Sequence, residues 1–229
     1  MKKESLNLKV IAKIYTDFPE KFGIPRQSGL VDTEAVIVFE PEFRNPDAVR
    51  GIENFNYLWL LWEFSESIID SWSPTVRPPR LGGNKRLGVF ATRSPFRPNP
   101  IGLSSVKLLR VQLSETKGPM LFVSGADILN GTPIYDIKPY LAYADSHIDA
   151  NNGFTDYNLG RLTKVEISHN VNCSISDSDL TIVKQLLIED PRPSYQNSND
   201  RVYNLCYKDY EVKFCVNGDC ATIVEINVK

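Results

Sequence analysis

The stretch LGVFATRSPFRPNPIGLS, residues 87–104, carries the strongest structural information in this chain. Apolar residues open it as a strand, and three prolines, Pro95, Pro98 and Pro100, then turn it into a loop. Each proline fixes its own φ angle and favours extended geometry for the residue before it. We therefore expect a long but stiff loop. Gly102 at its end would let the chain and a ligand approach each other closely.

Positive charge is concentrated around this loop. Residues 71–114 include eight lysines and arginines and no aspartate or glutamate. A rigid cationic loop suits an anionic or nucleotide-like ligand, and a basic loop exposed to solvent is the alternative interpretation. The whole chain has a net charge of −2, but residues 1–114 carry +4 and residues 115–229 carry −6. Any phosphate contacts should therefore lie mainly in the first half.

Short apolar or alternating segments separated by Pro/Gly-rich loops dominate the first 150 residues, and helical periodicity is almost absent. This pattern predicts a mainly β protein whose N-terminal part is a closed or nearly closed β-barrel. The segment YLWLLWEF is nearly all apolar and suggests a strand buried on both faces. The expected strands are residues 6–16, 35–39, 57–64, 88–91, 105–113 and 121–126.

The pattern changes in the last third of the chain. Residues 151–162 are predicted to be a linker, so the domains would be 1–150 and 163–229. Strand-like segments at 164–168, 201–207, 210–216 and 221–228, with a helix at 176–190, predict a small α+β domain. Asn217-Gly218 is a two-residue hairpin signal, and a turn centred there would place Cys215 opposite Cys220. The cytosol would keep these thiols reduced.

Other features exclude several classes of protein. The four cysteines form no C-x-x-C pair and there are only two histidines, so we expect neither a metal site nor histidine acid–base catalysis. No apolar run approaches the ~18 residues of a membrane span. The N-terminus MKKESLNLKV lacks the apolar segment of a signal peptide. The chain is expected to be cytoplasmic and not associated with a membrane.

Four segments in a fixed order resemble the TsaA/TrmO-type tRNA methyltransferases: EKFGIPRQSG (20–29), PTVRPPRLGG (74–83), the proline-rich stretch above, and NGTPIYDIKPYLAYAD (130–145). EDPRPSY (189–195) extends the match. That family uses S-adenosylmethionine to methylate N6 of threonylcarbamoyl-adenosine at position 37 of tRNA, next to the anticodon. The resemblance implies this activity, the tRNA anticodon stem-loop as partner, a homodimer with the cofactor near its interface, and a C-terminal domain that aids tRNA recognition. The alternative is a non-catalytic barrel that binds S-adenosylmethionine or RNA.

The resemblance also implies a set of cofactor contacts. Asn130 stands where the family usually has aspartate; it keeps a hydrogen-bond acceptor and loses the charge. From the residues alone, Arg26 could be an ordinary surface arginine and Asp127 a loop cap. The implied cofactor-binding residues are Pro25, Arg26, Gln27, Ser65, Glu66, Arg93, Leu103, Asp127, Ile128, Leu129 and Asn130.

The N6 nitrogen is a weak nucleophile unless its proton is removed, so a carboxylate base could assist the transfer. Asp136 is the candidate general base, and it could equally form a structural pair with Lys138 or Arg97. Phe96 or Tyr195 could stack on a splayed base. The arginines that could contact RNA phosphates are Arg77, Arg80, Arg97 and Arg192.

Overall fold

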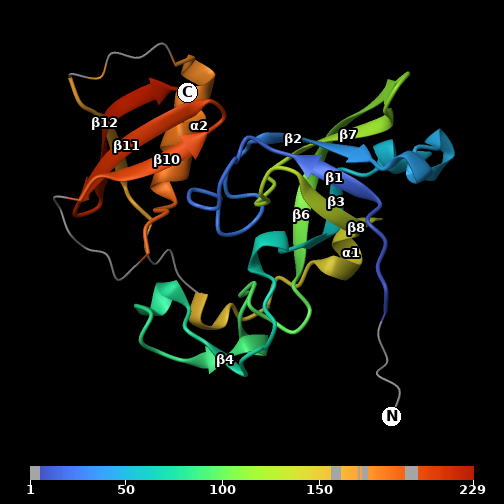
Figure 1. Cartoon of the computed structure of the whole chain (residues 1–229), viewed down its shortest axis with the longest axis horizontal. Coiled ribbons are helices and arrows are strands. Elements are labelled where there is room, and N and C mark those ends of the chain that lie inside the picture. Colours follow the sequence, from blue (N-terminus) through green and yellow to red (C-terminus); the bar gives the residue numbers. More distant parts are fainter. Residues whose placement is uncertain (1–5, 156–160, 170, 172–174, 194–200) are drawn as a thin grey trace.

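The structure is a computed structural model that describes residues 6–155, 161–169, 171, 175–193 and 201–229, with only the backbone of Arg80. Two β units make up most of the described chain (Figure 1). The N-terminal unit is a closed barrel, drawn on the right of the picture, and the C-terminal unit is a sheet with one helix, drawn at the upper left. The predicted fold class, mainly β with an N-terminal barrel, is confirmed.

Within the described residues, six antiparallel strands close the barrel. Their order is β1 (Ala12–Tyr15), β2 (Glu34–Phe39), β7 (Gly118–Ser124), β6 (Ile101–Ser114), β3 (Tyr57–Glu63) and β8 (Thr132–Pro139). β8 was not predicted as a strand, and it contains two prolines, Pro133 and Pro139, which are uncommon inside sheets. It nevertheless pairs with β1 on one side and with β3 on the other, and so closes the barrel.

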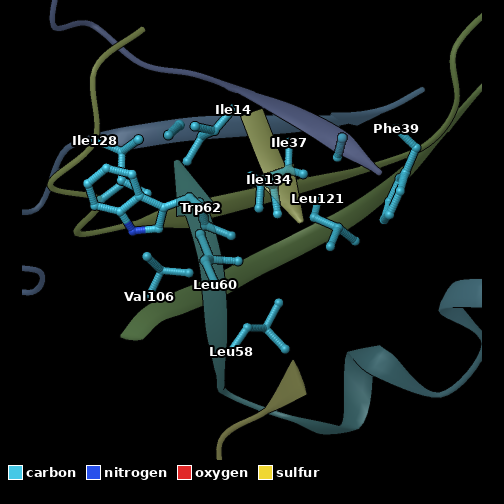
Figure 2. Close-up of a cluster of buried hydrophobic side chains, with 14 of the residues drawn as sticks. Ile14, Ile37, Phe39, Leu58, Leu60, Trp62, Val106, Leu121, Ile128 and Ile134 are labelled. Atoms are coloured by element: carbon cyan, nitrogen blue, oxygen red, sulfur yellow. The ribbon is translucent and has the colours of Figure 1, made fainter. Parts of the chain in front are cut away.

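The barrel core is built from the alternating apolar residues of these strands (Figure 2). Leu58, Leu60 and Trp62 of β3 point inward and are buried. The prediction that β3 is buried on both faces is wrong, because its other face is only partly covered and Tyr57 is 44% exposed. Burial of each large apolar side chain contributes roughly 1.5–3 kcal/mol, so the inward face of β3 is a main source of barrel stability.

The connections between barrel strands contain short 3-10 helices and one small ribbon. Asn45 caps η2 (Pro46–Val49) by accepting a hydrogen bond from the Asp47 amide at 3.0 Å, as the sequence NPDAVRG indicates. The prediction of a strand over 88–91 is wrong in extent and place: β5 (Leu87–Gly88) pairs with β4 (Thr75–Val76) outside the barrel. The remaining 3-10 helices here are η1 (Pro41–Phe43), η3 (Ile52–Asn54), η4 (Ser65–Ser67), η5 (Pro79–Leu81) and η6 (Val89–Ala91).

The C-terminal unit follows α1 (Ala142–Asp145) and η7 (Gly153–Thr155). Its strand order is β10 (Tyr203–Tyr207), β11 (Tyr210–Asn217), β12 (Cys220–Val228) and β9 (Lys164–Ile167), with β9 parallel to β12. Helix α2 (Asp177–Ile188) packs against this sheet, and Ser176 caps it by accepting from the Asp179 amide at 3.1 Å. At 12 residues α2 is the longest helix described, so no described helix could cross a bilayer.

The turn of the C-terminal hairpin lies one residue later than predicted, which moves each cross-strand partner by two residues. Its turn residues are Gly218 and Asp219, so Asn217 pairs with Cys220 and Cys215 lies opposite Thr222. Gly218 has a φ of +61°, which places the glycine at the first central position as in a type II′ turn. The predicted register, with Cys215 directly opposite Cys220, is therefore wrong, and both thiols are free.

The first loop, residues 16–33 between β1 and β2, joins the two units. Phe18 and Val31 are only 1% and 2% exposed, and they belong to the apolar core of the C-terminal unit. The Phe18 ring lies 6.3 Å from the Tyr207 ring, and the Lys208 amide donates to Asp17 O at 2.9 Å. The first loop therefore packs on the C-terminal sheet although it originates in the barrel.

Candidate active site

A large open groove runs between the first loop, the end of β3 with η4, and the proline loop, which we define as residues 92–100. Asp127 and Leu129, from the segment that connects β7 to β8, also line it. Nine of the eleven predicted cofactor-binding residues line the groove: Pro25, Arg26, Gln27, Ser65, Glu66, Arg93, Leu103, Asp127 and Leu129.

Hydrogen bonds to backbone amides hold the first loop against the barrel. The Gly29 amide donates to Gly125 O at 2.9 Å, and the Ser105 amide donates to Ser28 Oγ at 3.2 Å. A Cβ atom on Gly125 would lie 3.1 Å from Gly29, and Gly125 has a φ of +82°. Glycine at 125 therefore permits both the turn and the close approach of the two chain segments.

A hydrogen-bonded chain of three side chains leads from the barrel core into the groove. The Trp62 indole Nε1 donates to Ser104 Oγ at 2.9 Å, and Ser104 Oγ donates to Asp127 Oδ1 at 2.6 Å. Burial raises the pKa of the Asp127 carboxyl above its usual value, and the bond from Ser104 opposes that rise in part. A carboxyl with a raised pKa inside a groove is suited to accept a proton or to pair with a cation.

Gly102 provides the space that the Trp62 indole occupies. A Cβ atom at this position would lie 2.2 Å from Trp62 Cε2 and 2.5 Å from Cζ2. Gly102 was expected to allow a ligand close to the backbone. In the structure Gly102 lines the groove, and its lack of a side chain also leaves the space that the Trp62 indole occupies when it donates to Ser104.

Two side-chain pairs connect the walls of the groove. Arg93 of the proline loop donates to the side-chain oxygen of Gln27, and the Gln27 amide donates to Arg26 O. On the other wall Lys21 Nζ donates to Glu66 O at 2.7 Å and lies 3.4 Å from the Glu66 carboxylate. The first loop is thus tied both to the proline loop and to η4.

Ile128 and Asn130 do not line the groove. Ile128 is fully buried in the barrel core, and its carbonyl accepts from Thr16 Oγ1 at 2.9 Å. The Asn130 side chain accepts from the Thr16 amide at 3.1 Å. Asp136 is also outside the groove; its carboxylate lies 2.6 Å from Lys138 Nζ, which is the structural alternative that the sequence left open.

The predicted RNA-contacting residues occupy different environments. Arg77 and Phe96 are exposed and line the groove, and Phe96 is 51% exposed. Arg97 also lines it, and its guanidinium donates to Thr92 O at 3.2 Å, which folds the proline loop back on itself. The Arg192 side chain is only 10% exposed and donates to both carboxylate oxygens of Asp190. The Arg80 side chain and Tyr195 lie outside the described residues.

Sequence reasoning missed Trp62, Ser104 and Lys21 as parts of the site. The alternation within β3 could have singled out Trp62 as an inward residue, but nothing local identifies its partner Ser104. In the portion of the chain that the structure describes, no three His, Cys, Asp or Glu side chains lie together as metal ligands.

Comparison with known proteins gives consistent matches over both units. The model of the tRNA-methyltransferase O N-terminal domain matches residues 13–146, and the model of the TrmO C-terminal domain matches residues 162–229. A tRNA (adenine(37)-N6)-methyltransferase of Escherichia coli K12 is 38% identical over 93% of this chain and 94% of its own length. One from Eikenella corrodens is 42% identical over 74% of this chain and 96% of its own length.

A Pseudomonas aeruginosa relative, named provisionally as an S-adenosylmethionine-dependent methyltransferase, is 40% identical over 81% of each chain. The crystal structure of TrmO from the same organism superposes with a TM-score of 0.79 at 30% identity, and the match covers 99% of this chain and 98% of that one. With both domain models matched in order and relatives similar over nearly their full length, the chain belongs to the tRNA-methyltransferase O family.

Proposed function

We propose that this protein transfers the methyl group of S-adenosylmethionine to N6 of the adenosine at position 37 of tRNA. The observation that carries the proposal is the groove in which the first loop, η4, the proline loop and Asp127 come together. The names of the E. coli and Eikenella relatives support the reaction, and the name of the Pseudomonas relative supports the cofactor.

The chemistry of the groove fits this cofactor. S-adenosylmethionine bears a sulfonium and an ammonium, and the groove carries the carboxyl groups of Asp127 and Glu66. The carboxylate at the methionine end of the cofactor would pair with Arg93. Leu103 and Leu129 would make apolar contact with its adenosine. When bound, the cofactor supplies an electrophilic methyl group on sulfur. Of the predicted residues, Ile128 and Asn130 would contribute through the backbone or by placing the first loop.

The acceptor that we propose is threonylcarbamoyl-adenosine, whose N6 carries one hydrogen. As the N–C bond forms and the S–C bond breaks, this hydrogen leaves as a proton, and a carboxylate can take it. Asp136 was the sequence candidate, but it is paired with Lys138 outside the groove. We assign the role to Asp127, because its raised pKa favours proton acceptance and Ser104 fixes its orientation.

The exposed side chains of Arg77 and Phe96 in the groove suit the anticodon stem-loop. Arg77 would contact a phosphate, and Phe96 would stack on a base.

The proposed assembly is a homodimer with the cofactor near its interface. Leu103 and Phe90, which line the groove and are 57% and 73% exposed, would be covered in part by the second copy. The proposed division is a barrel domain of residues 1–150, a linker of 151–162 and an RNA-assisting domain of 163–229. The family models match two regions compatible with that division. The proposed location is the cytoplasm.

Transfer of labelled methyl groups tests the proposal. Purified protein and labelled S-adenosylmethionine are incubated with total tRNA from a strain that lacks the activity, and with tRNA that also lacks the threonylcarbamoyl group. We expect transfer to the first tRNA and much less to the second. Cofactor binding without transfer to either would favour the alternative, a non-catalytic module that binds S-adenosylmethionine or RNA.

A further inference from the structure

The first loop has two sides with different surroundings. Pro25, Arg26 and Gln27 line the groove. Phe18 and Val31, at the two ends of the loop, are buried in the apolar core of the C-terminal unit. The loop that forms one wall of the groove is therefore packed on a unit that contributes little else to it.

Arg26 makes the most specific contact between the loop and the C-terminal unit. Its guanidinium donates to Asp190 O at 2.8 Å and to Arg192 O at 3.1 Å, across 164 and 166 residues of sequence. Both acceptors are backbone carbonyls of the turn that follows α2. Hydrogen bonds from a charged donor are stronger than neutral ones, so this pair of contacts fixes the position of Arg26.

The turn that receives Arg26 is itself fixed. Asp190 has a φ of +43°, which is uncommon for a residue other than glycine. Its carboxylate accepts from Arg192 Nε at 2.8 Å and from a terminal guanidinium nitrogen at 3.0 Å. The Arg192 side chain is only 10% exposed. This bidentate pair holds the two carbonyls in place for Arg26.

A second contact places the loop backbone on the C-terminal sheet. Gly23 has a φ of +97°, and a Cβ atom there would lie 2.0 Å from Leu205 Cδ1. The loop therefore lies directly on β10 at a point two residues before Pro25. A shift of the C-terminal unit would be transmitted to the groove through this contact and through Arg26.

On the groove side the position of Arg26 determines that of its neighbours. The Arg26 carbonyl accepts from the side-chain Nε2 of Gln27, and Gln27 Oε1 accepts from the Arg93 guanidinium. We propose that Arg26 is a positioning residue, which transmits the placement of the Asp190–Arg192 turn to Gln27 and Arg93 and so shapes the cofactor wall of the groove. The C-terminal unit then has a role in cofactor binding besides any role toward RNA. The identity of the ligand rests on the proposed function. The claim that Arg26 positions Gln27 and Arg93 does not.

The test compares Arg26→Ala, Arg26→Lys and Asp190→Asn. Asparagine tolerates the left-handed conformation of residue 190 but loses the charge that holds Arg192, and Asp190 does not line the groove. Arg44→Ala is the matched control, because Arg44 also donates to two carbonyls, Phe39 O at 2.9 Å and Thr116 O at 3.1 Å, away from the groove. Two readouts are taken: hydrogen exchange of residues 20–29 without cofactor, and calorimetric affinity for S-adenosylmethionine.

We expect Arg26→Ala and Asp190→Asn to accelerate exchange of the first loop, including the Gly29 amide, and to weaken cofactor affinity about tenfold or more. Arg26→Lys should fall between: both bonds come from one guanidinium nitrogen, which an ammonium could replace, but the preorganised guanidinium loses less side-chain freedom for each bond it forms. Arg44→Ala should change neither readout. If Asp190→Asn leaves both unchanged while Arg26→Ala loses affinity alone, Arg26 contacts the cofactor directly and the inference is wrong. Failure of the wild-type protein to bind S-adenosylmethionine would refute the proposed function. The hydrogen-exchange comparison would still test whether Arg26 holds the first loop on the Asp190–Arg192 turn.

Discussion

Substitution of Gly102 by alanine should disrupt the site through Trp62 rather than through the backbone. The new methyl group would lie 2.2 Å from Trp62 Cε2, 2.5 Å from Cζ2 and 2.6 Å from Cδ2, so the buried indole must move. Overpacking of this kind costs typically 1–3 kcal/mol, and loss of the buried Trp62–Ser104 hydrogen bond adds about 1 kcal/mol. We therefore expect Gly102→Ala to lower the free energy of unfolding by about 2–4 kcal/mol.

Gly88→Ala is the matched control in the same stretch of chain. A Cβ at Gly88 meets nothing within 4 Å, and its φ of −57° is open to alanine. At such a site alanine should be neutral or stabilise the protein by about 0.4–1 kcal/mol, because it restricts the unfolded chain. The two substitutions are chemically identical, but only Gly102→Ala is predicted to destabilise the protein.

Denaturant titration followed by tryptophan fluorescence measures both effects, and methyl transfer measures the consequence for activity. Displacement of Trp62 removes the support of Ser104 and hence of Asp127, so activity should fall by about a hundredfold, as for a misplacement of roughly 1 Å. If Gly102→Ala is as stable and active as Gly88→Ala, then the Trp62–Ser104–Asp127 chain has no role in shaping the site.

Three further perturbations address the charge, the RNA contacts and the thiols. Burial raises the pKa of Asp127 in the folded protein above its ordinary 3.8. The folded protein therefore loses stability as pH rises from 3.8 through the higher pKa of the folded state. Asp127→Asn should thus be at least as stable as wild type in thermal melts at neutral pH, yet lose methyl transfer; a variant that is both less stable and fully active would contradict this. Arg77→Glu should weaken tRNA binding and reduce the slope of log affinity against log salt by about 0.7–0.9 per lost phosphate contact, whereas Lys117→Glu at the distant β6–β7 turn should leave that slope unchanged; equal slopes for both would exclude the Arg77 contact. Conversion of Cys215 and Cys220 to serine should leave the initial rate of transfer unchanged, and loss of activity with retained fold would assign the thiols a role that the structure does not indicate.

Local patterns in the sequence predicted much of the fold. Ser176 before the α2 segment and Pro191 after it bracket a helix that begins at Asp177 and ends at Ile188. Apolar alternation likewise predicted β2, β6, β7 and the three C-terminal antiparallel strands to within a few residues at most of their ends. These elements were predictable because their signals, caps and periodicity, lie within the elements themselves.

The errors occurred where the decisive contact is distant in sequence or depends on turn type. β8 contains two prolines and charged residues, and only pairing with β1 and β3 makes it a strand. At the hairpin, the choice of Gly218-Asp219 over Asn217-Gly218 moves the turn by one residue and each cross-strand partner by two, so that Cys215 faces Thr222 and not Cys220.

The candidate site was predictable by segment but not by contact. The family resemblance pointed to the first loop, η4, the proline loop and the segment before β8, and the groove brings them together. It did not indicate that Arg26 binds carbonyls 164 and 166 residues away, or that Gly102 accommodates Trp62. The partners of Arg26 are set by how the two units pack and that of Gly102 by the pairing of β3 with β6, and no local pattern contains either.

Mass spectrometry of the nucleosides of treated tRNA is the most direct test of the central claim. Hypomethylated tRNA is incubated with S-adenosylmethionine and either the wild-type protein or Asp127→Asn, then digested and separated, and the anticodon-loop fragment is sequenced by fragmentation. The account predicts that the modified adenosine at position 37 becomes one methyl group heavier, with the methyl on N6, and that Asp127→Asn forms far less of this product. A methyl group at another position, or no methylated product from a wild-type protein that binds the cofactor, would contradict it.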